Sequence, residues 1–172
     1  MTGGIVDLTQ IYWDMRISER YPTVEIRLMD VGTSIDDAIM MAGLVRALIT
    51  TCYEHVQRKQ SAPPIRQELL RVAHWQAARY GLEGDLIDVY TISALPARHM
   101  IEKLLSFVRP ALEVHGDWEE ISTLVHATMS RGTGAARQRA IYQRTDSLEE
   151  IVSYLITETA RETGGIEQLK TA

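Results

Sequence analysis

Residues 11–30, IYWDMRISERYPTVEIRLMD, contain two short runs in which apolar and polar residues alternate. Every second residue is apolar in residues 11–17 and again in residues 24–28, which is the period of a β-strand with one buried face. The segment between the runs is polar and ends in a proline, which interrupts a strand. The stretch therefore predicts an antiparallel hairpin with one acidic residue and one arginine on the polar side of each strand.

The two apolar faces of this hairpin coincide only if the numbers of paired residues have an odd sum, and a sum of about 41 fits the loop. This register sets Arg16 opposite Glu25 and Asp14 opposite Arg27. Such pairs can be cross-strand ion pairs on a solvated face. They can also form a site, because arginine binds carboxylate or phosphate with two hydrogen bonds and a carboxylate can hold Mg²⁺. The residue pattern leaves both interpretations open.

Helical periodicity replaces the alternation from Ser34 onward, with Ser34 as the N-cap and two aspartates in the first turn. The first helix is apolar nearly all round, so we expect it to be the central buried helix. The single cysteine, Cys52, falls on its stripe and is expected to be a small buried apolar residue. The main stripe comprises Ile35, Ala38, Ile39, Ala42, Val45, Leu48, Ile49, Cys52 and Val56, and the residues Met40, Leu44, Ala47 and Thr51 widen it.

The rest of the chain reads mainly as helix. A second helix should end at Gly81, and a short hairpin should follow that turns at residues 83–85. Four more helical segments follow, and the first contains Pro110. The candidate N-caps of the other three are Asp117, Thr133 and Asp146.

These elements predict an α+β fold in which about six helices pack on a small antiparallel sheet, with the hairpin of residues 11–30 at its centre. We expect one domain over residues 1–162, with residues 34–162 as its helical region. Residues 163–172 are expected to form a frayed tail.

The segment RGTG at residues 131–134 opens a helix that also carries Arg137 and Arg139. Free N–H groups and guanidinium groups converge there, as in an anion cradle. The segment lacks the glycine spacing of a P-loop or a dinucleotide motif. A flexible cap on a basic helix explains the same residues.

Composition limits the classes of function. With 172 residues and 45% apolar content the chain can bury a real core. A net charge of −5 and basic residues without aromatic neighbours predict no binding of nucleic acid. The uncharged stretches of the first helix are broken by Arg46 and are too short for a bilayer, so no membrane association is expected. One cysteine and no signal-like start suit the cytoplasm.

The motifs IYWDMRIS, PTVEIRLMDV, AARYGLEG and RGTGAARQR occur in this order along the chain. Together they resemble the C-terminal half of the carboxylate-amine ligases, also called type-two glutamate-cysteine ligases. The resemblance implies a curved antiparallel sheet like that of glutamine synthetase. It also implies a reaction that joins the side-chain carboxyl of a glutamate-like substrate to a small amine through an acyl phosphate, with ATP and Mg²⁺.

Carried onto this chain, the resemblance implies that Glu25 is a metal ligand and that Arg27 is the catalytic cation beside the transferred phosphoryl group. Arg16 and Asp14 would bind substrate, Arg16 by contacting its carboxylate, and Arg79 would line the cleft. These residue types suit phosphoryl transfer, which depends on positioning and charge neutralisation. For Arg79, an amphipathic helix with a tryptophan anchor remains the other interpretation.

The resemblance also implies that an earlier half of the ligase supplies further acidic metal ligands and much of the nucleotide site. We therefore expect the chain to be inactive alone and to work as a homo-oligomer or with a partner chain that supplies the N-terminal half. The alternative is a non-catalytic helical domain, derived from the same fold, that serves assembly or binding. Retention of the two acid–arginine pairs separates these interpretations and favours the ligase.

Overall fold

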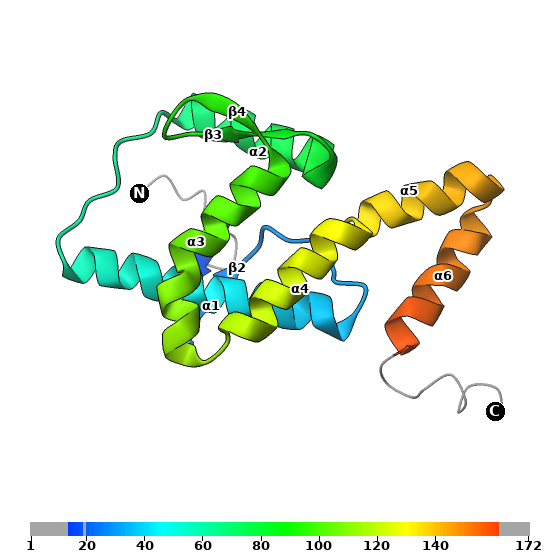
Figure 1. The fold of residues 1–172 in the computed structure, drawn as a ribbon, viewed down its shortest axis with the longest axis horizontal. Coiled ribbons are helices and arrows are strands. Elements are labelled where there is room, and N and C mark those ends of the chain that lie inside the picture. The colour runs from blue at the N-terminus through cyan, green and yellow to red at the C-terminus, as the bar shows by residue number, and fades with distance from the viewer. Residues whose placement is uncertain (1–13, 19, 162–172) are drawn as a thin grey trace, which may run out of the picture. The chain divides into compact units, whose positions relative to one another are not determined.

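The computed structural model describes residues 14–18 and 20–161, and this part of the chain is α+β. It contains six α-helices, one short 3-10 helix and four strands (Figure 1). The contacts divide the chain into two compact units, one ending at Val31 and the other beginning at Gly32. The fold class and the number of helices are as predicted, but the strands form two separate two-stranded sheets instead of one sheet with the hairpin at its centre. The expected tail, residues 163–172, lies outside the described residues.

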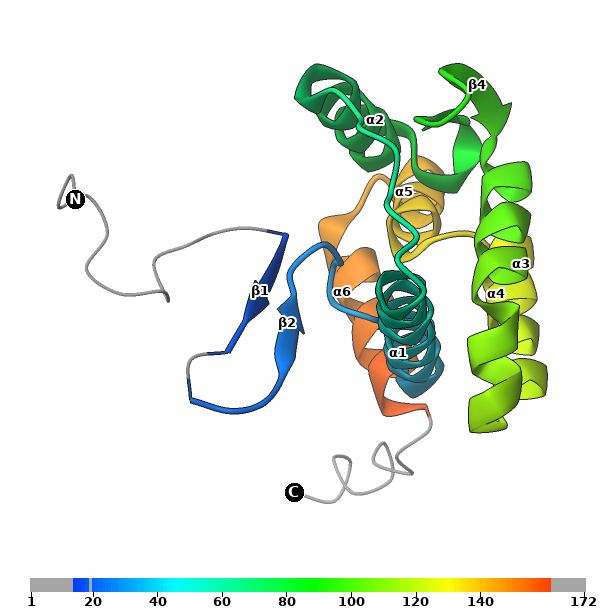
Figure 2. The same ribbon diagram turned by 90° about the vertical axis from the view of Figure 1, so that its left-hand side faces the viewer.

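The N-terminal unit contains a hairpin of β1 (Met15–Ile17) and β2 (Val24–Ile26), which Figure 2 shows in blue. The strands pair antiparallel with Arg16 opposite Glu25, so the predicted register is confirmed. The loop is held by an N–H of Tyr21 that donates to the hydroxyl of Ser18 (3.2 Å). On the apolar side of this small sheet Met15, Ile17 and Val24 are exposed, and Ile26 is half-buried.

In the second unit, α1 (Ile35–Gln57) begins at Ser34, whose hydroxyl accepts the N–H of Asp37 at 3.2 Å. α2 (Gln67–Tyr80) ends at Gly81, where φ is 56°, a conformation that glycine adopts without strain. Both predicted helix ends are therefore confirmed. A 3-10 turn, η2 (Gly81–Glu83), follows α2.

The second hairpin is present but turns at a different place. Gly84 is extended and leads the chain into β3 (Asp85–Asp88), which pairs with β4 (Ser93–Pro96) as a sheet of its own. The prediction of a turn at residues 83–85 is therefore wrong. The reversal lies at residues 89–92, because the Asp88 carboxylate accepts the N–H groups of Tyr90 (2.9 Å) and Thr91 (3.4 Å).

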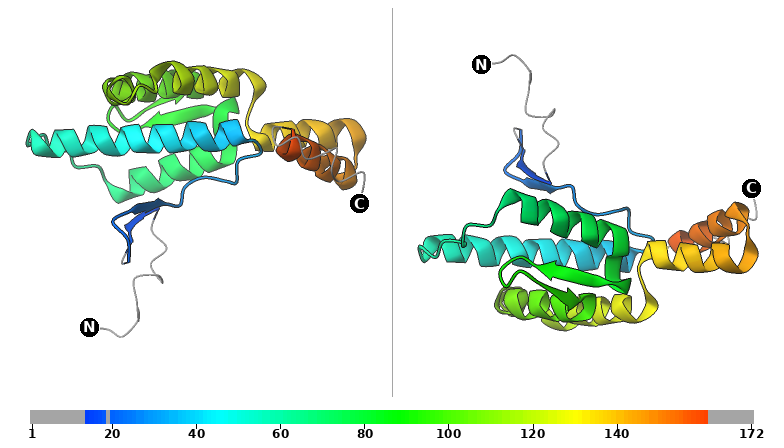
Figure 3. Two further views of the ribbon diagram at one scale, coloured as in Figure 1. Left: turned by 90° about the horizontal axis from the view of Figure 1, so that it is seen from below. Right: turned by 90° about the horizontal axis from the view of Figure 1, so that it is seen from above.

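The core of the second unit lies where α3 (Ala97–His115) and α4 (Trp118–Arg131) pack on each other and on α1. Figure 3 shows α1 running beside α4. Pro110 lies inside α3, which continues past it to His115. The buried cluster consists of Met40, Ala47, Leu105, Val108, Ala111, Leu112, Ile121 and Val125.

The last two helices, α5 (Gly134–Thr145) and α6 (Leu148–Ala160), pack against each other. Thr133 caps α5 as predicted, because its hydroxyl accepts the N–H of Ala136 (3.1 Å). Asp146 does not begin α6. It ends α5 with a positive φ of 51°, and the following residue, Ser147, is the N-cap of α6.

The prediction that α1 is a central buried helix is wrong. Only one side of α1 is packed, and its buried residues are Met40, Gly43, Ala47 and Thr51. Cys52 is exposed, so its predicted burial is wrong as well. The physical reason is that α3 and α4 pack on the side of α1 that carries Met40, Leu44 and Ala47, which only widened the predicted stripe, together with Gly43.

Candidate functional site

The hairpin brings together the four charged residues that the sequence singles out on its two strands. The Nε of Arg16 donates to one oxygen of Glu25 at 2.6 Å, and a guanidinium nitrogen of Arg27 lies 3.3 Å from the other. The backbone N–H of Arg27 donates to the carbonyl of Asp14 (2.8 Å), so these two residues are also paired, one residue beyond the ends of β1 and β2. The predicted juxtaposition of these residues is therefore confirmed.

This arrangement places one carboxylate between two guanidinium groups. The side chain of Arg16 is 19% exposed, whereas those of Arg27 and Glu25 are 37% and 44% exposed. Arg27 is thus the more accessible of the two cations, and its contact with Glu25 is the longer one. An accessible guanidinium held by a neighbouring acid can contact an anionic substrate.

The same geometry bears on a divalent metal. Mg²⁺ takes oxygen ligands in octahedral geometry and is seldom held by one protein group. In residues 14–18 and 20–161 no group of three or more acidic, histidine or cysteine side chains lies close enough to hold a metal ion. Glu25 is moreover engaged by two arginines. The residues present therefore do not fit a metal by themselves.

Arg79 belongs to the second unit, in the last turn of α2. It is exposed, and its guanidinium carbon lies 5.8 Å from the centre of the Tyr80 ring. Trp75 meets the same ring edge-on, with 6.0 Å between the ring centres. These contacts are those expected for an amphipathic helix with a tryptophan anchor, which was one of the two interpretations. The place of Arg79 in a substrate cleft stays a prediction.

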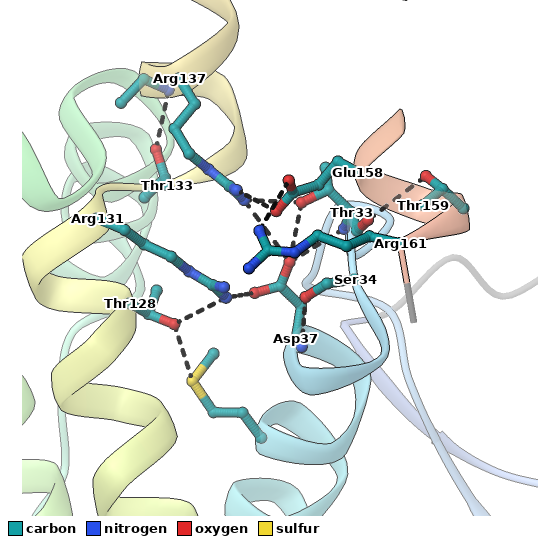
Figure 4. Close-up of polar contacts among 12 residues, drawn as sticks. Thr33, Ser34, Asp37, Thr128, Arg131, Thr133, Arg137, Glu158, Thr159 and Arg161 are labelled. Carbon is teal, nitrogen blue, oxygen red and sulfur yellow. Dashed lines mark hydrogen bonds and ion pairs between the residues drawn. The ribbon is translucent and has the colours of Figure 1, made fainter. Parts of the chain in front are cut away.

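A second polar cluster joins the ends of α1, α4, α5 and α6 (Figure 4). Thr33 donates its N–H (3.1 Å) and hydroxyl (3.0 Å) to one oxygen of Asp37, and Arg131 donates to the other. Arg137 donates to the hydroxyl of Thr33 (2.7 Å) and to Glu158 (2.8 Å). Two acids and two arginines thus tie the helix ends together, and of the four only Arg131 is exposed.

The environment of Asp37 stabilises its charged form. Burial alone would raise the pKa of this carboxyl, but the Thr33 hydrogen bonds and the Arg131 charge outweigh it and hold the pKa below the ordinary value of 3.8. Asp37 therefore acts as a permanent anion for Arg131 at neutral pH. The sequence showed Asp37 only as a first-turn acid, because its partners lie far away along the chain.

The arginines of the candidate anion cradle all have acidic partners. Arg131 pairs with Asp37, Arg137 with Glu158 and Asp37, and Arg139 with Glu83 on η2 at 2.6 Å. The loop itself forms a helix cap, with Gly132 at a positive φ of 84°. Of the two interpretations of this segment, the contacts favour the cap on a basic helix over a phosphate site.

None of the described helices is both long and apolar enough to cross a bilayer.

Comparison with known proteins places these observations in a family. The model of glutamate-cysteine ligase family 2 matches residues 1–171. A protein from Frankia alni, whose name describes it provisionally as glutamate–cysteine ligase 2-2, is 40% identical over 158 residues, which are 92% of this chain and 41% of the relative. Relatives from Salinispora arenicola and Sorangium cellulosum, provisionally named glutamate–cysteine ligase 2, are 42% and 37% identical over 91% and 92% of this chain.

The chain spans about two fifths of the length of these relatives, since it covers 41% of the Frankia protein and 42% of the other two. Another Frankia alni relative, 42% identical, is longer still, and the chain covers 18% of it. The matched region nevertheless takes in both described units and nearly the whole chain. The chain therefore belongs to glutamate-cysteine ligase family 2.

Proposed function

We propose that this chain supplies one part of an ATP-dependent carboxylate-amine ligase that acts on glutamate and a small amine. The observation that carries the proposal is the family match over residues 1–171, combined with a hairpin that holds Glu25 between Arg16 and Arg27. The curated relatives named for glutamate–cysteine ligase are much longer than the part that this chain matches. The matched region is therefore only one portion of such a ligase, and we propose that activity also requires the portion outside it.

Arg27 is the proposed catalytic cation. Ligation through an acyl phosphate moves a phosphoryl group, and negative charge on its oxygens must be neutralised in the transition state. Of the two hairpin arginines, Arg27 has the more exposed side chain, at 37%, and the longer contact with Glu25. It can turn toward a bound phosphoryl group while Arg16 remains paired.

Arg16, with its Nε fixed by Glu25 at 2.6 Å, is the proposed contact for the substrate carboxylate, and Asp14 is proposed to bind substrate beside it. The planar guanidinium favours this role, because its donors match the two oxygens of a carboxylate. Arg79 keeps its proposed place in the cleft wall. Glu25 can serve a metal only together with acids from the remaining part of the ligase, since no metal cluster forms within the described residues.

A second candidate is a non-catalytic assembly domain. The observation that favours it is that the arginines of the hairpin already have an acidic partner, as structural ion pairs do. In that case the hairpin would contribute only its fold. The two candidates differ in one measurable property, which is turnover in the presence of the remaining part of the ligase.

The test is reconstitution. The purified chain is mixed or co-expressed with the portion of the Frankia alni relative named glutamate–cysteine ligase 2-2 that it does not cover. ATP-dependent joining of glutamate to cysteine is then followed by mass spectrometry of the product. The intact relative sets the scale. We expect no product from the chain alone and ATP-dependent product from the pair. Product from the isolated chain, or an assembled pair that makes none while the intact relative is active, would contradict the proposal.

A further inference from the structure

The outer face of α1 carries an apolar band that no other helix or strand of the second unit covers. The band consists of Ala38, Met41, Ala42, Val45, Leu48, Ile49, Cys52, Tyr53 and Val56, and all of these residues except the half-buried Val45 are exposed. At 3.6 residues per turn they fall on the side of the helix opposite Met40, Ala47 and Thr51, which pack in the core. The band and the packed stripe together make α1 apolar on two sides.

The band contains no charged residue, which is unusual for a helix face in water. A helix with one solvated face normally carries charged or polar side chains there. Here the exposed fractions reach 63% for Tyr53 and 69% for Val56. At 1.5 Å per residue the band is about 28 Å long. A continuous exposed apolar surface of this kind marks a place where another protein surface packs.

The length of the relatives indicates which protein surface packs on the band. In the Frankia, Salinispora and Sorangium proteins the region matched by this chain accounts for 41 to 42% of the length, so more than half of each relative lies outside it. That additional chain is part of the same molecule in the relatives. It is therefore available to cover the outer face of the helix that corresponds to α1.

We propose that the outer face of α1 is the docking surface for the part of a family ligase that lies outside the region matched by this chain, and that this part contacts it through an apolar surface of its own. The proposal rests on the proposed function in one respect, which is that the partner is the remaining part of a family relative. It adds the place of contact. The contact is driven by burial of apolar side chains, at the helix face that the sequence pattern marks as the main apolar stripe.

A second copy of this chain is a weaker occupant. Two α1 bands packed against each other would bury roughly 300 Å² on each side, if the band is about 10 Å wide, whereas a stable complex buries about 800 Å² per partner. The part of the relatives outside the matched region, more than half of their length, is large enough to cover the band and further surface around it. The tests below separate these occupants.

Cys52 provides a reporter within the band. It is the single cysteine of the chain, and it is exposed. Its rate of alkylation is measured in the free chain and after addition of the portion of the Frankia alni relative that the chain does not cover. We expect alkylation to slow on the order of tenfold or more in the complex, because access to a thiol in a packed interface is restricted.

The double variant Ile49→Gln, Tyr53→Gln places two polar side chains in the band, and its affinity is compared with that of the wild type by sedimentation or calorimetry. The matched control is Val152→Gln, Ile156→Gln on α6, where the replaced residues are 54% and 57% exposed. We expect the α1 variant to bind the complementary portion about tenfold or more weakly and the control to bind within about twofold of wild type. Circular dichroism verifies that both variants keep the helical fold.

The outcomes are distinct. Equal loss of binding in both variants, or unchanged Cys52 alkylation in a complex that forms, would overturn the docking surface. Self-association of the free chain that the α1 variant abolishes, without binding of the complementary portion, would assign the band to a second copy and also overturn it. A wild-type complex with protected Cys52 but without ligation would support the docking surface and contradict the proposed function.

Discussion

Gly43 allows α1 and α4 to approach closely, and replacing it with alanine should destabilise the second unit. A Cβ at this position would lie 2.4 Å from Cδ1 and 2.7 Å from Cγ1 of Ile121, which is 2% exposed and belongs to the core cluster. Alanine is favoured over glycine inside a helix by about 0.5 to 1 kcal/mol. Forcing an additional methyl group into a packed core costs about 1 to 3 kcal/mol. The expected result for Gly43→Ala is a net loss of about 1 kcal/mol.

The sign should reverse when the clashing side chain is removed. Ile121→Ala deletes both close atoms and leaves Cβ at 3.8 Å, an ordinary contact. This variant alone should lose about 2 to 5 kcal/mol, and adding Gly43→Ala to it should restore about 1 kcal/mol. The free energy of unfolding of the wild type, both single variants and the double variant is measured by urea denaturation. If Gly43→Ala had the same effect in both backgrounds, the proposed contact between α1 and α4 would be wrong.

Two further predictions concern ion pairs. Hydrogen bonds from Lys103 and from the backbone N–H of Tyr90 hold the pKa of Asp88 at about 2. The charged carboxylate therefore stabilises the fold above about pH 4, and this stabilisation is lost as the pH falls toward about 2. When the pH is lowered from about 4 to about 2, the urea midpoint of Asp88→Asn should fall less than that of the wild type. Arg137→Ala removes the hydrogen bond of 2.8 Å to Glu158, and hydrogen exchange of the α6 amides should become about tenfold faster. The control is Arg139→Ala, which removes an exposed ion pair with Glu83 and should change this rate by under about threefold.

The hairpin register could be predicted because it depends on local pattern. Apolar residues alternate on both strands, and a slip of one residue would turn every side chain to the other face. The register follows once the loop length is known, and Arg16 is indeed opposite Glu25. Helix ends at Ser34 and Gly81 were predictable for the same reason, because the capping residue itself determines the local backbone.

The packed side of α1 could not be predicted, because it depends on which neighbours are present. Residues on both sides of the helix are apolar, and only the positions of α3 and α4 decide that Met40 and Ala47 are buried while Cys52 is exposed. The cluster around Asp37 is similar, since Arg131 and Glu158 come from distant helices. The turn at residues 89–92 was missed because the Asp88 carboxylate holds it and the segment contains no glycine or proline that would mark a turn.

The central claim is that the hairpin carries the catalytic cation of a ligase. The direct measurement is the turnover of the reconstituted enzyme with Arg27→Ala, compared with Arg20→Ala, an exposed arginine in the loop of the same hairpin. Loss of a transition-state cation typically lowers turnover by about 10² to 10³, whereas an exposed arginine contributes under about 1 kcal/mol to stability. Arg27→Lys should recover little, because an ammonium group lacks the planar pair of donors.

We predict a loss of about a hundredfold or more in turnover for Arg27→Ala, with unchanged folding and assembly, and near wild-type turnover for Arg20→Ala. Near wild-type turnover of the assembled Arg27→Ala enzyme would contradict the account and leave the hairpin charges as structural ion pairs.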